Sequence, residues 1–254
     1  KHILLALLCT LSSLAALDAV YGDQAGNPYS STGRTSVSND ILRSIDAHGE
    51  VILVLLDLTA AFDTIDHGIL LQRLSNRYGI NGTALQWFRS YLSDRAQAVV
   101  IDGIQSELSP LTDGVPQCSV LGPVCFTLYT APLEDVVRSS EGVELMSYAD
   151  DTQLYMLISP SKKGAGKASL ASSVTEASLQ LEHCVHDVKS WMTANRLKLN
   201  SGKTDILHIT SKFTRHSLPV EYLQIGSESV QLVSSARNLG VVFEIGRASC
   251  RERV

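Results

Sequence analysis

The chain alternates between segments whose apolar residues recur at helical spacing and short segments that are apolar throughout. Residues 51–56 form an unbroken apolar run of strand length, which predicts a buried strand that ends at Asp57. Other segments carry apolar residues at intervals of three and four, which predicts helices over residues 39–47, 67–78, 83–92, 123–137 and 174–195. Elements of both kinds can therefore share one packed core.

The remaining extended segments are short and bounded by turn residues. They predict strands over residues 96–101, 106–111, 143–146, 152–157, 197–200 and 205–209. Asp102–Gly103 joins the first two as a hairpin, and Asp150–Asp151 lies at the tip of a second hairpin. A Ser/Gly/Lys-rich stretch over 159–171 predicts a solvated loop. Because helices and strands mix without a βαβ rhythm, we expect an α+β fold, an antiparallel sheet with helices on one face.

Composition places the chain among globular proteins. Hydrophobic residues make up 44% and charged residues 19% of its 254 residues, which excludes a disordered chain and a coiled coil. The formal charge of −5 argues against binding of nucleic acid through bulk positive charge. Any nucleic-acid partner must therefore bind through a local group of residues. The five cysteines form no CxxC pair and no metal-type spacing, which favours a reducing compartment.

Both ends of the chain differ in character from the sequence between them. Residues 1–30 begin with an apolar stretch that resembles a secretory signal but is too short and too interrupted by Ser and Thr to span a membrane. We expect a signal-like or mispredicted leader there, with an amphipathic or buried helix as the alternative. Residues 244–254 can be back-translated into codons that resemble a common sequencing adapter, and we interpret them as an artefact rather than an exposed basic tail. The domain is therefore expected over residues 31–243, without a membrane partner.

Acidic residues at two strand ends are the first candidates for chemistry. Asp57 ends a completely apolar strand, where an ionised carboxylate loses its hydration and needs a cation. If the hairpin that bears Asp150 and Asp151 lies beside that strand, the three carboxylates converge. Hard oxygen ligands with no His or Cys nearby suit Mg²⁺, and two such ions about 4 Å apart support in-line phosphoryl transfer. The pattern therefore points to nucleotidyl transfer.

Four motifs in order carry a family resemblance. They are 56–67 (LDLTAAFDTIDH), 114–117 (GVPQ), 148–151 (YADD) and 197–204 (LKLNSGKT). Together they resemble the palm motifs of reverse transcriptases, in the form typical of LINE-type (non-LTR) retrotransposons. The resemblance implies a polymerase palm with partial fingers and with no thumb in this chain. It also implies an intracellular RNA-directed DNA polymerase, in the nucleus or cytoplasm, that extends a DNA primer on an RNA template with dNTPs and two Mg²⁺ ions.

Residue by residue, the resemblance implies a metal site and a group near the leaving pyrophosphate. Asp57 and Asp150 would be the principal metal ligands. Leu58 would contribute its backbone carbonyl, and Asp151 would support the other ligands. Lys203 would act beside the leaving pyrophosphate as a proton donor or charge stabiliser. Taken alone, Lys203 is typical of a surface lysine, and only the joint pattern favours the catalytic interpretation.

The same resemblance implies a nucleotide-binding side of the site. Phe62 occupies the position of the steric gate, where an aromatic ring leaves no room for a ribose 2′-hydroxyl. Ala60 and Ala61 would lie under the triphosphate, and Gln117 would contact the incoming nucleotide and the template strand. Taken alone, Phe62 would be assigned to the core. Two further acids are interpreted as capping and first-turn residues of the following helix: Asp63 and Asp66.

The chain departs from the family at Cys118, where family members carry Gly. A Cβ at this position adds strain if the backbone φ is positive, so the change is expected to lower polymerase activity without disturbing the fold. Two alternatives follow: a catalytically inactive retroelement remnant with weak nucleic-acid binding, or another palm enzyme such as a nucleotide cyclase or an RNA-dependent RNA polymerase. Phe62 argues against the last of these, because a ribonucleotide polymerase needs a residue that accepts the sugar hydroxyl.

Overall fold

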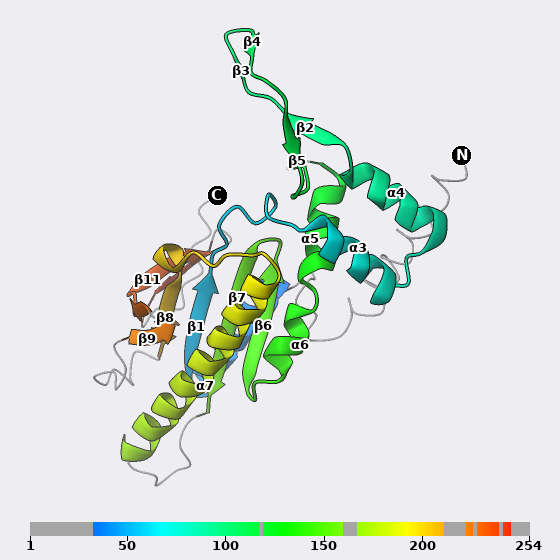
Figure 1. The fold of residues 1–254 in the computed structure, drawn as a ribbon. Helices are drawn as coiled ribbons and strands as arrows, with labels where there is room; N and C mark the ends of the chain where they lie inside the picture. The colour runs from blue at the N-terminus through cyan, green and yellow to red at the C-terminus, as the bar shows by residue number, and fades with distance from the viewer. Residues whose placement is uncertain are drawn as a thin grey trace. The chain divides into compact units, whose positions relative to one another are not determined.

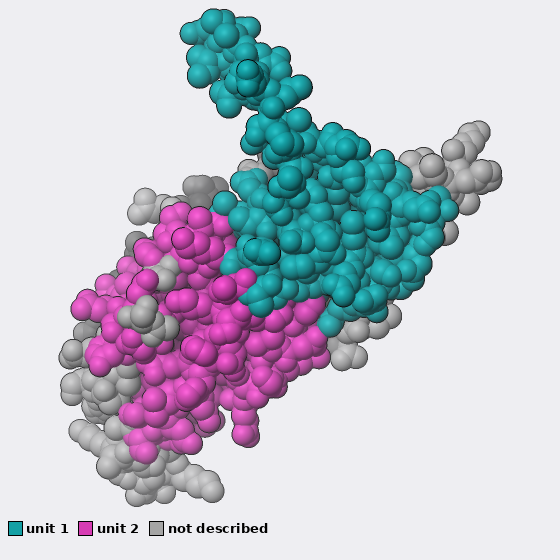
Figure 2. Space-filling view, viewed as in Figure 1, with its two compact units in different colours: residues 1–23, 60–131, 194–197 teal, residues 24–59, 132–193, 198–254 magenta. Residues whose placement is uncertain are grey.

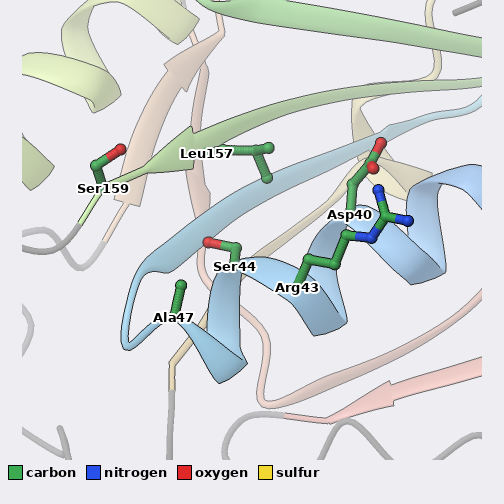
Figure 3. Close-up of a pocket in the computed structure, with 6 residues that line it drawn as sticks. All are labelled: Asp40, Arg43, Ser44, Ala47, Leu157 and Ser159. Carbon is green, nitrogen blue, oxygen red and sulfur yellow. The ribbon is translucent and has the colours of Figure 1, made fainter. Parts of the chain in front are cut away.

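The computed structural model describes residues 33–116, 119–159, 167–210, 222–225, 228–238 and 241–244. These residues fall into two compact units, which Figure 2 shows in different colours. Within the described ranges, the helical unit comprises residues 60–131 and 194–197, and the sheet unit comprises 33–59, 132–193 and 198–244. The expected leader (1–30) and all of the expected artefact tail except Glu244 lie outside the described residues.

The sheet unit is built on four antiparallel strands in the order β6–β7–β1–β8 (Figure 1). They are β6 (Val143–Tyr148), β7 (Asp151–Ile158), β1 (Glu50–Leu56) and β8 (Asp205–Ile209). Every residue of β1 is buried, as its apolar run predicts. Leu56 pairs with Thr152, so β1 ends and β7 begins at the same end of the sheet.

Helices cover the sheet on both faces. On one face, α2 (Gly33–Asp46) inserts Val37 and Ile41 among alternate residues of β1 and its neighbours. On the other face, Figure 1 shows α7 (Lys167–Ala194) crossing the strands, and α7 buries residues at helical spacing. The α+β class and the antiparallel sheet are confirmed. Helices on one face were predicted, whereas a strand that is apolar at every position needs cover on both.

Smaller elements complete the sheet unit. The helix α6 (Leu133–Arg138) precedes β6, and the single turn η1 (Ser201–Lys203) precedes β8. Two antiparallel pairs follow β8: β9 (Tyr222–Ile225) with β10 (Glu228–Gln231), and β11 (Ser235–Asn238) with β12 (Val241–Glu244). Between these pairs, the N–H of Val233 donates to the carbonyl of Ile206 at 2.8 Å, which ties this region to β8.

The helical unit contains α3 (His67–Asn76), α4 (Gly82–Leu92) and α5 (Leu121–Thr130). Arg73 of α3 donates to the carbonyl of Tyr129 and to the side-chain oxygen of Asn195. The hydroxyl of Tyr129 donates to the carbonyl of Asn195 at 2.6 Å. These hydrogen bonds join α3, α5 and residues 194–197, so three segments that are distant in the sequence form one unit.

A hairpin arm over residues 95–111 extends from the helical unit (Figure 1). Its base pairs β2 (Arg95–Gln97) with β5 (Ser109–Leu111), and its tip pairs β3 (Val100–Ile101) with β4 (Ile104–Gln105). Asp102 and Gly103 have φ values of 49° and 79°, as the predicted two-residue turn requires. The arm exposes five large apolar side chains: Val99, Val100, Ile101, Ile104 and Leu108.

Three predicted elements differ from the structure, and the first is the strand predicted over 197–200, which forms only the isolated bridge of Leu199 with Leu58. The helix predicted over 123–137 is divided into α5 and α6, because Pro132 has no N–H with which to continue the first helix. The loop predicted over 159–171 is shorter, since α7 already begins at Lys167, in a run of Ala, Ser and Leu that supports a helix. No helix in the described ranges has both the length and the apolar composition needed to cross a bilayer.

Candidate active site

Three aspartates lie at one end of the sheet. Asp57 directly follows β1, and Asp151 is the first residue of β7. Continuing the β1–β7 register by one step sets these two residues opposite each other. Asp150 lies in the turn between β6 and β7, after Ala149, whose φ of 53° makes the turn tight. The strand pairing thus brings together the three acids that the sequence singled out.

Burial and mutual repulsion both act on Asp151. Burial raises the pKa of its carboxyl, and the negative charges of Asp150 and Asp57 raise it further. Any cation nearby would oppose these effects. Within the described part of the chain, no group of three or more His, Cys, Asp or Glu side chains is arranged to hold a metal ion. The charges of Asp57 and Asp150 nevertheless act on Asp151, so the three acids influence one another electrostatically.

Asp57 is held by the segment that precedes β8. Asn200 donates its side-chain Nδ2 to Oδ2 of Asp57 at 3.3 Å, and its backbone N–H donates to the carbonyl of Asp57 at 2.9 Å. Nζ of Lys203 lies 3.7 Å from the same Oδ2. The lysine side chain is 71% exposed, so the ion pair contributes little to stability and the ammonium can move toward a ligand.

Asn200 is a site residue to which the sequence motifs gave no role. Its contact with Asp57 spans 143 residues, so no local period reports it. The one signal was the match of residues 197–204 to a family motif, in which Asn200 stands shortly before Lys203. By holding one carboxylate oxygen and the backbone of Asp57, Asn200 acts as a positioning residue.

Leu58 is buried and forms an isolated antiparallel bridge with Leu199. The hydrogen bonds of this bridge are made by the peptide groups of the flanking residues, Asp57 and Thr59. The carbonyl of Leu58 takes no part in them and points away from the partner segment, since peptide groups alternate in direction along an extended chain. This orientation is compatible with the ligand role that the resemblance implies for that carbonyl.

The loop that follows belongs to the helical unit and begins with a tight turn. Ala60 has a φ of 51°, and its carbonyl accepts a hydrogen bond from the N–H of Asp63 at 2.9 Å. Ala61 is buried. The ring of Phe62 packs against Phe126 of α5, with centroids 4.9 Å apart and planes tilted by 33°. Phe62 thus makes a core contact while its side chain stays partly exposed.

A second segment lies against this loop. The N–H groups of Gly114 and Val115 donate to carbonyls of the loop at 2.8 and 2.9 Å. Gly114 has a φ of 84°, and a Cβ there would lie 2.9 Å from the backbone of Asp63, so the close approach requires Gly. The predicted contact residue of this segment, Gln117, and the neighbouring Cys118 lie outside the described residues.

The start of α3 is fixed by two polar side chains. Oδ1 of Asp66 accepts a hydrogen bond from the N–H of Ile69 at 2.9 Å, so Asp66 is the helix cap. The predicted first-turn acid is wrong, because α3 begins at His67, its first turn contains no acid, and Asp63 lies before the cap. Nε2 of His67 lies 2.7 Å from the carbonyl of Gly114. The cap fixes the start of α3, and the His67 contact joins that start to the Gly114 segment inside the helical unit.

An antiparallel sheet with aspartates at adjacent strand ends, combined with covering helices, defines a polymerase palm. The chain belongs to the reverse transcriptase family: the family model described as "Reverse transcriptase (RNA-dependent DNA polymerase)" matches residues 17–240. The matched range includes every site residue named above. The family recognised from the four motifs is therefore confirmed.

Curated relatives of the chain come from mobile elements. It is 26% identical over 173 residues to the "RNA-directed DNA polymerase from mobile element jockey" of Drosophila melanogaster, a match that covers 66% of this chain and 17% of the relative. It is 27% identical over 219 residues to the "Probable RNA-directed DNA polymerase from transposon BS" of the same species, covering 82% and 22%. The chain thus spans less than a quarter of these relatives. Their names confirm the assignment to a retrotransposon reverse transcriptase of the LINE type.

Solved structures of similar fold include telomerases. The apo telomerase of Candida tropicalis, truncated from its C-terminal domain, matches with a TM-score of 0.56 and 12% identity, over 93% of this chain and 44% of that one. Another apo telomerase structure from C. tropicalis matches with a TM-score of 0.53 and 11% identity, over 95% and 39%. At this identity the match shows the fold alone, and it confirms the palm.

Proposed function

We propose that this chain is the polymerase domain of a retrotransposon reverse transcriptase, which extends the 3′-hydroxyl of a DNA primer on an RNA template with dNTPs. The observation that carries the proposal is the electrostatic coupling of Asp57, Asp150 and Asp151 at one end of the sheet. Carboxyls that repel one another in a half-buried position are typical of a site built for a cation and its anionic substrate. Family membership and the names of the relatives support the same activity.

The proposed cofactor is a pair of Mg²⁺ ions. Asp57, Asp150 and the carbonyl of Leu58 would hold them, with Asp151 in support, and these hard oxygens are the donors that Mg²⁺ prefers. The chemistry that bound ions supply is activation of the attacking hydroxyl and stabilisation of the leaving oxygen. The raised pKa of Asp151 fits such a cofactor, because a cation lowers the cost of ionising that carboxyl.

Other residues are proposed to orient the substrates. Lys203, whose ammonium stands beside Asp57, would stabilise the leaving pyrophosphate or donate a proton to it. Ala60 and Ala61 would leave room for the triphosphate near backbone N–H groups. Gln117 would contact the incoming nucleotide and the template. In this proposal the acids carry the chemistry and the loop residues select the substrate.

Primer extension tests the proposed activity. With a DNA primer annealed to an RNA template, dNTPs and Mg²⁺, the 254-residue protein is expected to add nucleotides, and excess EDTA is expected to abolish the addition. Unprimed RNA serves as the control. Addition that persists in EDTA would contradict the metal assignment. Folded protein that binds the primed template and adds nothing would contradict the activity.

Substitution of Phe62 tests the steric gate. Phe62→Val removes the ring and is expected to raise the kcat/KM for ribonucleotides relative to deoxynucleotides by about tenfold or more, because the 2′-hydroxyl then fits. Since Phe62 also packs against Phe126, the matched control is Phe126→Leu, which disturbs the same ring pair without opening the gate. If the ratio does not change in Phe62→Val, Phe62 is a core residue only.

Cys118 favours a second candidate function, a catalytically inactive remnant with weak nucleic-acid binding. If the backbone φ at position 118 is positive, the Cβ of Cys118 costs about 1–2 kcal/mol, which corresponds to about a five- to thirtyfold effect. Cys118→Gly is therefore expected to raise the extension rate by about this factor, whereas Cys118→Ala, which keeps the Cβ, gives no gain. If neither the wild type nor Cys118→Gly extends primers, the inactive remnant is favoured. If all three proteins are equally active, Cys118 does not lower the activity.

A further inference from the structure

Three side chains on the helical unit form a stacked row. Trp87 and Tyr91 lie one helical turn apart on α4, with ring planes within 6° of parallel and centroids 5.6 Å apart. Arg95, the first residue of β2, continues the row, because its Cζ lies 5.5 Å from the centre of the Tyr91 ring. All three side chains are partly exposed. This Trp87–Tyr91–Arg95 ladder therefore presents planar groups that a ligand can reach.

The ladder is anchored at both of its aromatic members. Phe88, which is only 5% exposed, packs edge-on against Trp87 with centroids 5.3 Å apart. The hydroxyl of Tyr91 lies 3.3 Å from Oγ of Ser119, and that Oγ accepts a hydrogen bond from the N–H of Gly122 at 2.9 Å. Rings that are already fixed lose little conformational freedom when a ligand stacks on them, which favours binding.

The segment that carries the ladder is positively charged. Residues 67–97 contain four arginines and one aspartate, so their formal charge is +3 in a chain whose total is −5. Arg73 is used inside the unit, whereas Arg77 and Arg89 are exposed. A polyanion is therefore attracted to this segment in particular, although the chain as a whole repels it.

We propose that the ladder binds unpaired bases of single-stranded RNA. Stacking of bases on aromatic rings and on arginine planes is how proteins hold single strands without reading their sequence, and a duplex hides those base faces. Tyr91 contacts Ser119, close in the chain to Gln117, which is proposed to contact the template. The inference rests on the proposed function because it identifies the bases on the ladder as template bases that have not yet been copied. Arg95 adds a cation for the stacked bases and their phosphates.

Metal-free RNA binding tests the ladder separately from catalysis. The probes are a labelled, unstructured RNA of about 12 nucleotides, within the size range of single-strand sites, and an abasic strand of the same length. In EDTA without dNTPs, Trp87→Leu is expected to weaken RNA binding by about tenfold and to leave binding of the abasic strand unchanged. The controls are Trp87→Phe, which keeps a ring, and Tyr222→Leu, which removes an exposed ring on β9.

Fluorescence reports on the stacking even if Trp87→Leu does not fold. The chain has two tryptophans, so Trp191→Phe leaves Trp87 as the only source of tryptophan emission, and RNA but not the abasic strand is expected to quench that emission. Three results would contradict the proposal that the ladder stacks on RNA bases. They are an equal loss of affinity for the RNA and the abasic strand in Trp87→Leu, an unchanged RNA affinity in folded Trp87→Leu, and Trp87 fluorescence that RNA does not quench. Primer extension is read in a separate assay. If the protein stacks on RNA but adds no nucleotides, the result would contradict the proposed activity and still support base binding by the ladder.

Discussion

Asp150→Asn is expected to reduce primer extension by about a thousandfold. The substitution keeps the size of the side chain and removes the negative charge proposed to hold Mg²⁺, and metal stabilisation of the transition state amounts to several kcal/mol. Asp150 lies in the turn between β6 and β7, so the sheet is expected to stay intact. The measurement is the rate of single-nucleotide addition on a saturating primed template, with thermal unfolding followed by circular dichroism to check the fold.

The matched control for this prediction is Asp205→Asn. Asp205 begins β8 and pairs with Leu55 of β1, so it is another acid near the same end of the sheet, without an assigned role. Its substitution is expected to change the rate by less than about threefold, a small difference in barrier. Extension by Asp150→Asn within about tenfold of the wild type would exclude Asp150 as a principal ligand. A large loss of the addition rate in Asp205→Asn would instead assign a metal ligand to Asp205 on β8.

Local patterns were sufficient to predict the strands that form the acidic end of the sheet. An uninterrupted apolar run is compatible with few structures other than a buried strand, and Asp57 marks the point where β1 stops. The β6–β7 hairpin followed from apolar runs on both sides of Asp150 and Asp151. The pairing of β1 with β7 cannot be predicted from local patterns, because register between segments far apart in the chain depends on packing that no single segment records.

The remaining differences have separate physical causes. The hydrogen bond from Asn200 to Asp57 is a tertiary contact and leaves no trace in local spacing. The sequence also does not show the environment of Asp151; in the folded turn, burial and the charges of Asp150 and Asp57 raise the pKa of its carboxyl. The break at Pro132 did have a local signal, the proline itself, but the apolar period on both sides of it suggested one continuous helix.

His208→Ala is expected to lower the free energy of unfolding by about 3–5 kcal/mol. His208 on β8 and Glu50 at the start of β1 are 3% and 4% exposed, and Nε2 of the histidine lies 2.7 Å from Oε2 of the glutamate. Removal of the imidazole leaves the Glu50 carboxyl buried without this partner, and a buried polar group that has lost its hydrogen bond carries its full desolvation cost. Urea unfolding followed by circular dichroism measures the change.

The double variant Glu50→Leu/His208→Leu separates the contribution of the pair from the cost of isolating one partner. It replaces both polar partners with apolar side chains, so it is expected to recover most of the stability lost in His208→Ala. Arg138→Ala provides the surface comparison: Arg138 lies 2.6 Å from Glu134 but is 69% exposed, and its loss is expected to cost less than about 1 kcal/mol. An equally small cost for His208→Ala would contradict the structural role of the buried pair. Because Glu50 begins the strand that Asp57 follows, a double variant that is stable yet extends primers poorly would indicate that the pair also aligns β1 for catalysis.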